Sequence, residues 1–162
     1  MASGANGKLA GEVSLEVARA ADLELLLEMM ADFNAGEQIA VEEERLRPAL
    51  GRLLAEPGLG RVWLIRCAGE LQGYAVVTLG YDLEFAGPDA FITELYLRPP
   101  ARGRGMGRAA LAQIEAATSA LGAHALHLMV RPENAAAVAL YASRGFTSPP
   151  RTFLSKVLAQ TP

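Results

Sequence analysis

The chain has 162 residues, 51% of them hydrophobic and 20% charged, which is enough to form one compact domain with an apolar core. Its formal net charge of -3 argues against a nucleic-acid-binding protein, because no excess of positive charge would attract phosphates. No apolar run approaches the about 20 residues that a membrane span needs, and the single Cys67 excludes an intramolecular disulfide.

The first eight residues, MASGANGK, contain one lysine and no apolar segment, which is not the pattern of a signal peptide. We therefore expect a flexible tail over residues 1–10, a single domain over residues 11–162 and a cytoplasmic protein. After this tail, alternation of apolar and polar residues over 13–17 predicts a strand. Asp22 is placed to cap a helix whose apolar face consists of Leu23, Leu26, Met30 and Phe33.

The middle of the chain predicts a helix followed by three strands. Residues 41–55 have a helical pattern that Pro48 interrupts, so this helix is kinked or begins later. Residues 61–67 and 71–81 are rich in strand formers and are separated by a short turn, which predicts a hairpin. Residues 81–88 are predicted to be a loop, and residues 91–97 a further strand.

The last third begins with a glycine-rich segment, RGRGMG, at residues 102–107. A helix follows, with a predicted buried face of Leu111, Ile114 and Leu121, and Gly122 lies just beyond its end. Residues 125–130 predict a strand covered on both faces. A short helix after Pro132, with Val138 and Tyr141 directed inward, and a strand over 152–158 complete an α/β pattern. Only the strands on either side of the helix after RGRGMG need to be parallel.

A strand, a glycine-rich turn and a helix start together predict an anion site, since backbone N–H groups gather at the positive end of the helix dipole. The arginines at 102 and 104 would add contacts to phosphate. A tight turn with solvated arginines is the structural alternative. A P-loop is excluded by the lack of Gly-Lys-Ser/Thr. A loose dinucleotide pattern, G-x-G-x-x-A, does occur at 105–110, but the chain after it supplies too few strands for a doubly wound sheet.

Four motifs together resemble the GNAT (Gcn5-related) N-acetyltransferase superfamily. Residues 102–107 are similar to its R/Q-x-x-G-x-G/A loop, and ITELYLRP at 92–99 is similar to the strand before that loop. NAAAVALY at 134–141 matches N-x-x-A-x-x-L-Y, and the following Gly145 and Phe146 match G-F. The resemblance implies a mixed, mostly antiparallel sheet in which one parallel strand pair splays apart around an acyl-CoA site, with helices on both sides.

The resemblance also implies binding roles for particular residues. Backbone groups of Leu95, Tyr96 and Leu97 would pair with the pantetheine arm of acetyl-CoA as though it were an added strand. The pyrophosphate would lie on the loop and the helix start, at Arg102, Gly103, Arg104, Gly105, Met106, Gly107 and Arg108. Asn134 and Tyr141 would contact the cofactor arm and the thiol, with Tyr141 as the general acid for the leaving thiolate. Their structural alternatives are a helix cap for Asn134 and core packing for Tyr141.

Glu94 is the first candidate for the catalytic base or for a residue that orders a water relay, because a carboxylate within an apolar strand is unusual. A purely structural hydrogen-bond acceptor is its alternative role. Asp82 and Glu84 are second candidates for the base. No metal site is predicted, because His124 and His127 are three residues apart in a strand and would point to opposite faces.

The resemblance implies an acetyl-CoA-dependent N-acetyltransferase in which a primary amine attacks the thioester directly in a ternary complex. Transfer of another acyl group or attack by an oxygen nucleophile is an alternative within the same chemistry. A non-catalytic acyl-CoA-binding or sensing module is a second alternative, and a dinucleotide-binding protein a third. Carboxylates in residues 33–45 and 81–88 indicate a cationic acceptor, either a small molecule or a peptide amine. The resemblance to the family also implies a possible homodimer.

Overall fold

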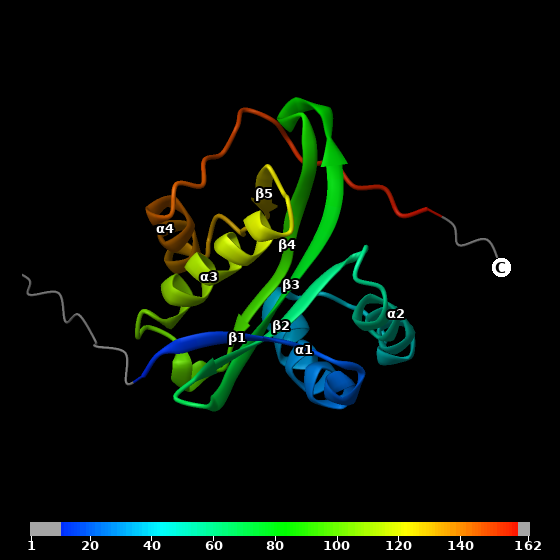
Figure 1. The fold of residues 1–162 in the computed structure, drawn as a ribbon, viewed down its shortest axis with the longest axis vertical. Helices are drawn as coiled ribbons and strands as arrows, with labels where there is room; N and C mark the ends of the chain where they lie inside the picture. Colours follow the sequence, from blue (N-terminus) through cyan, green and yellow to red (C-terminus); the bar gives the residue numbers. More distant parts are fainter. Residues whose placement is uncertain (1–10, 159–162) are drawn as a thin grey trace, which may run out of the picture. The chain divides into compact units, whose positions relative to one another are not determined.

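The computed structural model describes residues 11–158. The described residues up to Val130 form one compact unit and those from Arg131 onward form another, so each unit is described by itself. The first unit is built on a five-stranded sheet whose strands follow one another in chain order (Figure 1). These strands are β1 (Val13–Val17), β2 (Gly60–Cys67), β3 (Glu70–Asp82), β4 (Gly87–Leu97) and β5 (Ala125–Leu128).

Antiparallel pairing joins β1 through β4, and β4 pairs with β5 in parallel. The parallel pair is the one that the sequence requires, because the helix α3 (Met106–Ala120) connects these two strands. The predicted mixed, mostly antiparallel sheet is confirmed. Within residues 11–158, no helix is both long and apolar enough to cross a bilayer.

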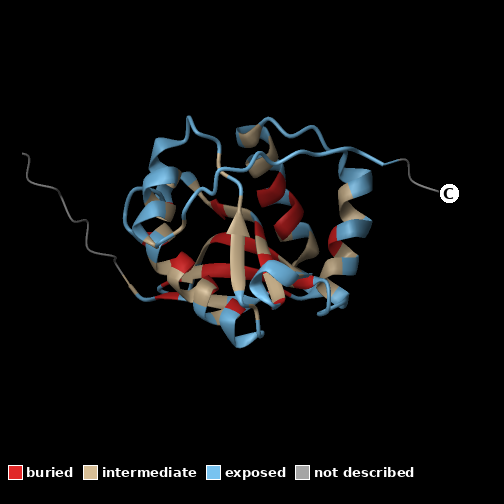
Figure 2. Cartoon of the chain, turned by 90° about the horizontal axis from the view of Figure 1, so that it is seen from above, coloured by how far each residue is buried: buried red, intermediate tan, exposed pale blue. Residues whose placement is uncertain are grey.

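Two helices, α1 (Leu23–Glu37) and α2 (Glu43–Ala55), cover one face of this sheet. Their apolar side chains pack with alternate residues of the central strands, and Figure 2 shows buried residues concentrated on the sheet and on the facing sides of helices. Leu26 and Tyr74 are fully buried in this cluster. Pro48 lies inside α2, whose N-terminus is at Glu43, two residues later than the predicted start.

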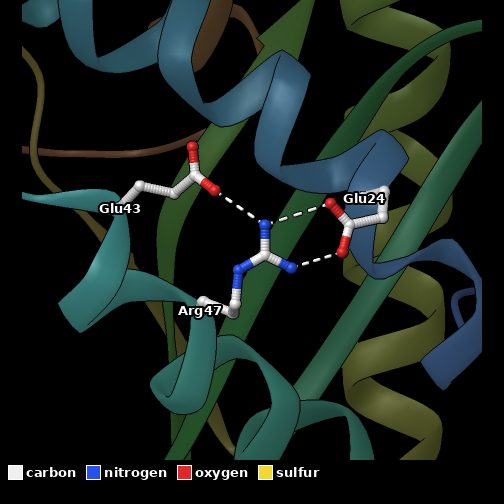
Figure 3. A network of polar contacts seen from close by, with 3 residues as sticks. All are labelled: Glu24, Glu43 and Arg47. Atoms are coloured by element: carbon white, nitrogen blue, oxygen red, sulfur yellow. Dashed lines mark hydrogen bonds and ion pairs between the residues drawn. The ribbon is translucent and has the colours of Figure 1, made fainter.

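A guanidinium joins α1 to α2 on the surface of this layer. Arg47 donates hydrogen bonds to both carboxylate oxygens of Glu24 on α1, and one further bond of 2.7 Å to Glu43 one turn earlier on its own helix (Figure 3). All three side chains are exposed to water, so screening limits what these ion pairs add to stability. The network links the two helices at the surface and contributes little to stability.

The opposite face of the sheet packs against α3. The helix buries Ala110, Leu111, Ile114 and Thr118, and the alternate strand residues that face it include Ala75 and Val77. Thr118 is only 1% exposed, and its hydroxyl has no hydrogen-bond partner among the residues that the structure describes. A buried hydroxyl without a partner loses its hydration and gains nothing in return.

We expect Thr118→Val to raise the free energy of unfolding by about 1 kcal/mol, because valine keeps the shape and removes the unsatisfied oxygen. Urea unfolding of both proteins measures the change. Ser119→Val, at an exposed neighbouring position, is the control for changing helix propensity alone. A loss of stability specific to Thr118→Val would mean that the hydroxyl is satisfied in solution.

Several predicted elements need correction in the first unit. The loop expected at 81–88 is largely strand, since β3 runs to Asp82 and β4 begins at Gly87, with one 3-10 turn (Leu83–Phe85) between them. Asp22 is at the start of α1, but its carboxylate accepts from the Arg19 N–H rather than from a helix N–H. Leu121 ends α3 instead of belonging to its buried face and is 37% exposed.

Strand β5 also differs from its prediction. It ends at Leu128, and its four residues are half-buried rather than covered on both faces. The reason is its position, because within the described residues it has a strand neighbour on one side only. An apolar run shows only which residues a strand contains, whereas the burial of the strand depends on how many structural elements pack beside it.

The second unit contains one helix, α4 (Ala135–Ser143), and an extended segment. Val138 is 39% exposed and no residue of α4 is buried, so the predicted inward face is not observed. Residues 152–158 form no strand, which contradicts the prediction, and Phe153, Leu154 and Val157 are exposed. Alternating apolar residues favour an extended chain, but a strand also needs a neighbouring strand, and among the described residues no strand pairing includes this segment.

Candidate functional site

The candidate site begins where β4 and β5 separate. The parallel pairing covers Asp89 to Ile92 on β4 and stops at the pair Ile92–Leu128. From Glu94 onward, β4 pairs only with β3, on its other side. The backbone of the last third of β4 therefore presents an edge that no described strand occupies, as the resemblance implies.

A β-bulge at Thr93 marks the same point. On β3, the adjacent residues Val76 and Val77 pair with Glu94 and Ile92, so Thr93 is the extra residue on β4. Paired residues of antiparallel strands place their side chains on the same face. Val76 belongs to the cluster under α1 and α2, and Val77 faces the other way. The bulge thus turns Glu94 to the α1–α2 face although Ile92, two residues earlier, lies on the α3 face.

Two hydrogen bonds show which backbone groups face the open edge. Arg98 donates its N–H to Gln72 on the β3 side, at 2.8 Å. Since backbone groups alternate between the two sides of a strand, the N–H and C=O of Leu97 and Leu95 face the open edge, and those of Tyr96 face β3. The Leu97 carbonyl accepts a 2.8 Å bond from Arg102 Nε, which agrees with this assignment. Leu95 and Leu97 are therefore placed to pair with an amide-containing ligand through their backbone, and Tyr96 is not.

The glycine loop follows directly on this edge. Gly103 and Gly105 have φ of 71° and 80°, in the left-handed region, and a Cβ built on either would meet no atom within 4 Å. Gly105 precedes the first residue of α3, and the first intrahelical bond runs from Ala109 N to Gly105 O. The N–H groups of Met106 and Gly107 come before that bond, at the positive end of the helix dipole. This open cradle of backbone donors suits a pyrophosphate.

The arginines in and beside the loop have different environments. Arg104 and Arg108 are exposed and add positive charge beside the helix start. Arg102 instead anchors the loop, since its Nε bonds the Leu97 carbonyl and its guanidinium carbon lies 5.6 Å from the centre of the Tyr96 ring. The charge, the donors and the open space together fit the phosphate and pantetheine groups of a coenzyme A thioester.

Glu94 makes a partly buried hydrogen bond at the α1–α2 face. The Tyr74 hydroxyl donates to Glu94 Oε2 at 2.6 Å, from a side chain with no exposed surface. Burial raises the pKa of Glu94 above its ordinary value, and the bond from Tyr74 partly opposes that rise. A carboxylate with a raised pKa is a stronger base than an ordinary one, and a hydrogen-bond donor stabilises its ionised form.

The raised pKa has a consequence for stability. The folded protein keeps the Glu94 proton at a pH where the unfolded chain has already lost it, so ionisation costs folding free energy. This contribution is complete below the ordinary pKa of glutamate and is lost as the pH rises through the folded value. We expect Glu94→Gln to flatten the decline of unfolding free energy over that pH range, as measured by urea titrations at a series of pH values. An identical slope in both proteins would show that Glu94 is not desolvated.

A second tyrosine continues this aromatic layer toward α1. The Tyr96 ring lies 5.7 Å from the Tyr74 ring, and its hydroxyl donates to Asp32 Oδ2 at 3.2 Å. Phe33 packs edge-on against Tyr74 at 6.5 Å. Burial, together with the charge of Asp32, raises the pKa of Tyr96. Asp32 and Tyr74 were not predicted from the sequence, and no local signal marks them, because their partners are 64 and 20 residues away.

The second candidates for the base lie at the far end of the β3–β4 hairpin. The Asp82 carboxylate accepts from the Glu84 N–H at 2.8 Å and so stabilises the 3-10 turn that joins these strands. This end of β4 precedes its parallel pairing with β5, whereas Glu94 follows it. The geometry therefore separates Asp82 and Glu84 along β4 from the open edge and from the glycine loop.

Asn134 and Tyr141 belong to the second unit. The Asn134 side chain accepts from the Ala137 N–H at 3.2 Å and caps α4, which is the structural role considered for it. The Tyr141 ring packs against Phe146 at 5.8 Å, and the Phe146 N–H donates to the Tyr141 carbonyl. The matched G-F motif thus orders the end of α4 around Tyr141. Their contacts with a cofactor remain predictions.

The two histidines have separate partners. His124, just before β5, lies with Nδ1 3.0 Å from the Phe85 carbonyl, and His127 lies with Nε2 3.4 Å from an Asp89 carboxylate oxygen. Among residues 11–158, no three His, Cys, Asp or Glu side chains gather as a metal site would require.

Residues 23–146 match the acetyltransferase (GNAT) family, and the chain belongs to that family. It is 35% identical over 114 residues to mycothiol acetyltransferase from Beutenbergia cavernae, and it spans about a third of that relative's length, 36%, with 68% of its own. An integron cassette protein from the Cole Harbour Salt Marsh metagenome is 32% identical, with a TM-score of 0.78 over 91% of each chain.

A predicted acetyltransferase from Clostridium acetobutylicum, solved with acetyl-CoA, has the same fold. It is 17% identical, with a TM-score of 0.74 over 89% of this chain and 96% of its own. Family membership associates this chain with acetyl transfer, and the mixed sheet with one parallel pair is not the doubly wound sheet of a dinucleotide-binding domain.

Proposed function

We propose that this chain transfers an acetyl group from acetyl-CoA to a primary amine, by direct attack of the amine on the thioester while both substrates are bound. The observation that supports this best is the bulge at Thr93, which lies where β4 leaves β5. It places the half-buried Glu94 carboxylate beside an open strand edge that leads straight to the glycine loop. In this proposal, acetyl-CoA binding and acceptance of the amine proton fall on consecutive segments of one strand.

Each segment has one task in this proposal. The N–H groups at the start of α3 and the exposed Arg104 and Arg108 bind the pyrophosphate. The backbone groups of Leu95 and Leu97 pair with the amides of the pantetheine arm, which brings the thioester up to the bulge. Tyr141 is assigned the proton that the departing thiolate takes up, on the strength of its family motif and its phenolic hydroxyl.

The base is needed because amines are mostly protonated at neutral pH. A lysine-like amine with a pKa of ~10.4 is neutral in only about one molecule in 2,500 at pH 7, a cost of roughly 4.6 kcal/mol. Glu94, directly or through water, takes the proton from the attacking nitrogen as the new C–N bond forms. The C–S bond then breaks and the thiolate leaves.

A panel of amines tests this proposal by release of free coenzyme A from acetyl-CoA. The panel contains polyamines, aminoglycosides, lysine and peptides with free N-termini, together with alcohols as oxygen nucleophiles. We expect turnover with at least one amine and a rise in melting temperature with acetyl-CoA. A rise with acetyl-CoA but no turnover would identify a binding module, and a rise with NADH alone would overturn the assignment.

A further inference from the structure

Tyr74, the hydrogen-bond partner of the half-buried Glu94, is itself buried in a way that the proposed reaction does not require. Tyr74 has 0% of its surface exposed, and its hydroxyl engages Glu94 Oε2 at 2.6 Å. Its ring is held from two sides, by the edge of Phe33 on α1 and by the ring of Tyr96 on β4. A hydroxyl on so constrained a ring can occupy few positions.

We propose that Tyr74 is a positioning residue for Glu94: its buried hydroxyl holds Oε2, fixes the plane of the carboxylate and leaves Oε1 to face the acceptor amine. This inference rests on the proposed function, since it assigns a role in presenting the base. The register supports it, because the bulge at Thr93 puts Glu94 opposite Val76, two residues from Tyr74 on the same face of β3.

The surroundings also determine which group is the donor in the hydrogen bond between Tyr74 and Glu94. Burial and the nearby Glu94 charge raise the pKa of the Tyr74 phenol far above its ordinary value, so this hydroxyl stays protonated and acts as a donor. A donor to the ionised carboxylate lowers the pKa of Glu94 and opposes the rise that burial causes. With this bond from Tyr74, Glu94 stays ionised, and so able to accept a proton, at lower pH than burial alone would allow.

Other groups around this pair do not replace the bond. From α2 the cluster receives apolar side chains, such as Leu50. On α1 the Asp32 carboxylate accepts a hydrogen bond from Tyr96 instead. The positive charges of Arg98 and Arg102 act on Tyr96. Among the residues that the structure describes, Tyr74 is the side chain that hydrogen-bonds Glu94.

Tyr74→Phe tests the proposal because it removes one oxygen and keeps the ring. We expect the Glu94 carboxyl carbon, followed by NMR and assigned with Glu94→Gln, to titrate at higher pH in Tyr74→Phe than in wild type. The rising limb of kcat/KM against pH should move upward with it, so that kcat/KM on that limb falls about tenfold while KM for acetyl-CoA is unchanged. Thr118→Val, which also removes a buried hydroxyl, should change neither curve.

Two further measurements guard against a folding defect and separate this inference from the proposed function. Site-specific 3-fluorotyrosine at position 74 keeps the hydroxyl and makes it a stronger donor, so Glu94 should titrate at lower pH. Tyr74→Phe in the Glu94→Gln background should leave the pH profile of that variant unchanged. If the wild type releases no coenzyme A with any amine, the proposed function fails. If the wild type is active and the Glu94 titration is the same with tyrosine, phenylalanine and fluorotyrosine, the positioning role fails alone.

Discussion

Glu94→Gln should lower kcat for acetyl transfer by about a hundredfold or more and leave the Kd of acetyl-CoA close to that of the wild type. Glutamine keeps the size of the side chain and can still accept a hydrogen bond from Tyr74, but it cannot take a proton from the attacking amine. The proposed donor site consists of the open edge of β4 and the glycine loop, which the substitution does not touch. Steady-state rates of coenzyme A release and calorimetric titration with acetyl-CoA measure the two quantities.

The pH profile makes this result specific. The wild-type rate should rise with pH through the raised pKa of Glu94, and the variant should lack that limb. Glu70→Gln, at an exposed position at the start of β3, is the matched control and should keep wild-type kinetics. If the loss instead follows Glu84→Gln or Asp82→Asn, the base lies at the hairpin end and not at the bulge.

Gly105→Ala should weaken acetyl-CoA binding by about tenfold or more. At φ of 80° a methyl group strains the backbone, and it also enters the open space in front of the first N–H groups of α3, where the proposed pyrophosphate oxygens would lie. Calorimetry or the thermal shift at rising acetyl-CoA concentration measures the loss.

Gly122→Ala is the control for this substitution. Gly122 lies beyond the other end of the same helix, has φ of 90° and likewise has no atom within 4 Å of an added Cβ. Both variants should lose a similar amount of stability, about 1–2 kcal/mol for the left-handed conformation. Equal acetyl-CoA affinity in the two variants would show that the loop does not hold the phosphates.

Much of the sheet order could be predicted because local chemistry determines it. The hairpin between β2 and β3, the start of α3 after the glycine loop and the parallel β4–β5 pair all follow from turn residues, periodicity and one crossover. Two predictions that depended on neighbouring strands were wrong. Residues 152–158 have the composition of a strand but belong to no strand pairing among the described residues, and β5 has an apolar run but one strand neighbour.

The candidate site shows the same division. Glu94 could be singled out from the sequence because a carboxylate in an apolar strand is unusual, and the loop could be singled out by its glycines. The hydrogen bond from Tyr74 could not be predicted, since it depends on the β3–β4 register and on a bulge that no residue type in the sequence indicates. The face on which Glu94 lies could not be predicted either. Ile92 and Glu94 are two residues apart, and in a regular strand such residues lie on the same face.

The bulge also determines which genetic changes this strand can tolerate. Substitution of Thr93 alters one side chain. Deletion of this single codon would make Ile92 and Glu94 adjacent and leave them opposite Val77 and Val76, so regular pairing would return with both side chains on their present faces. In a library of variants, position 93 should therefore accept deletion as well as many replacements, whereas a one-residue deletion in a regularly paired stretch exchanges the two faces.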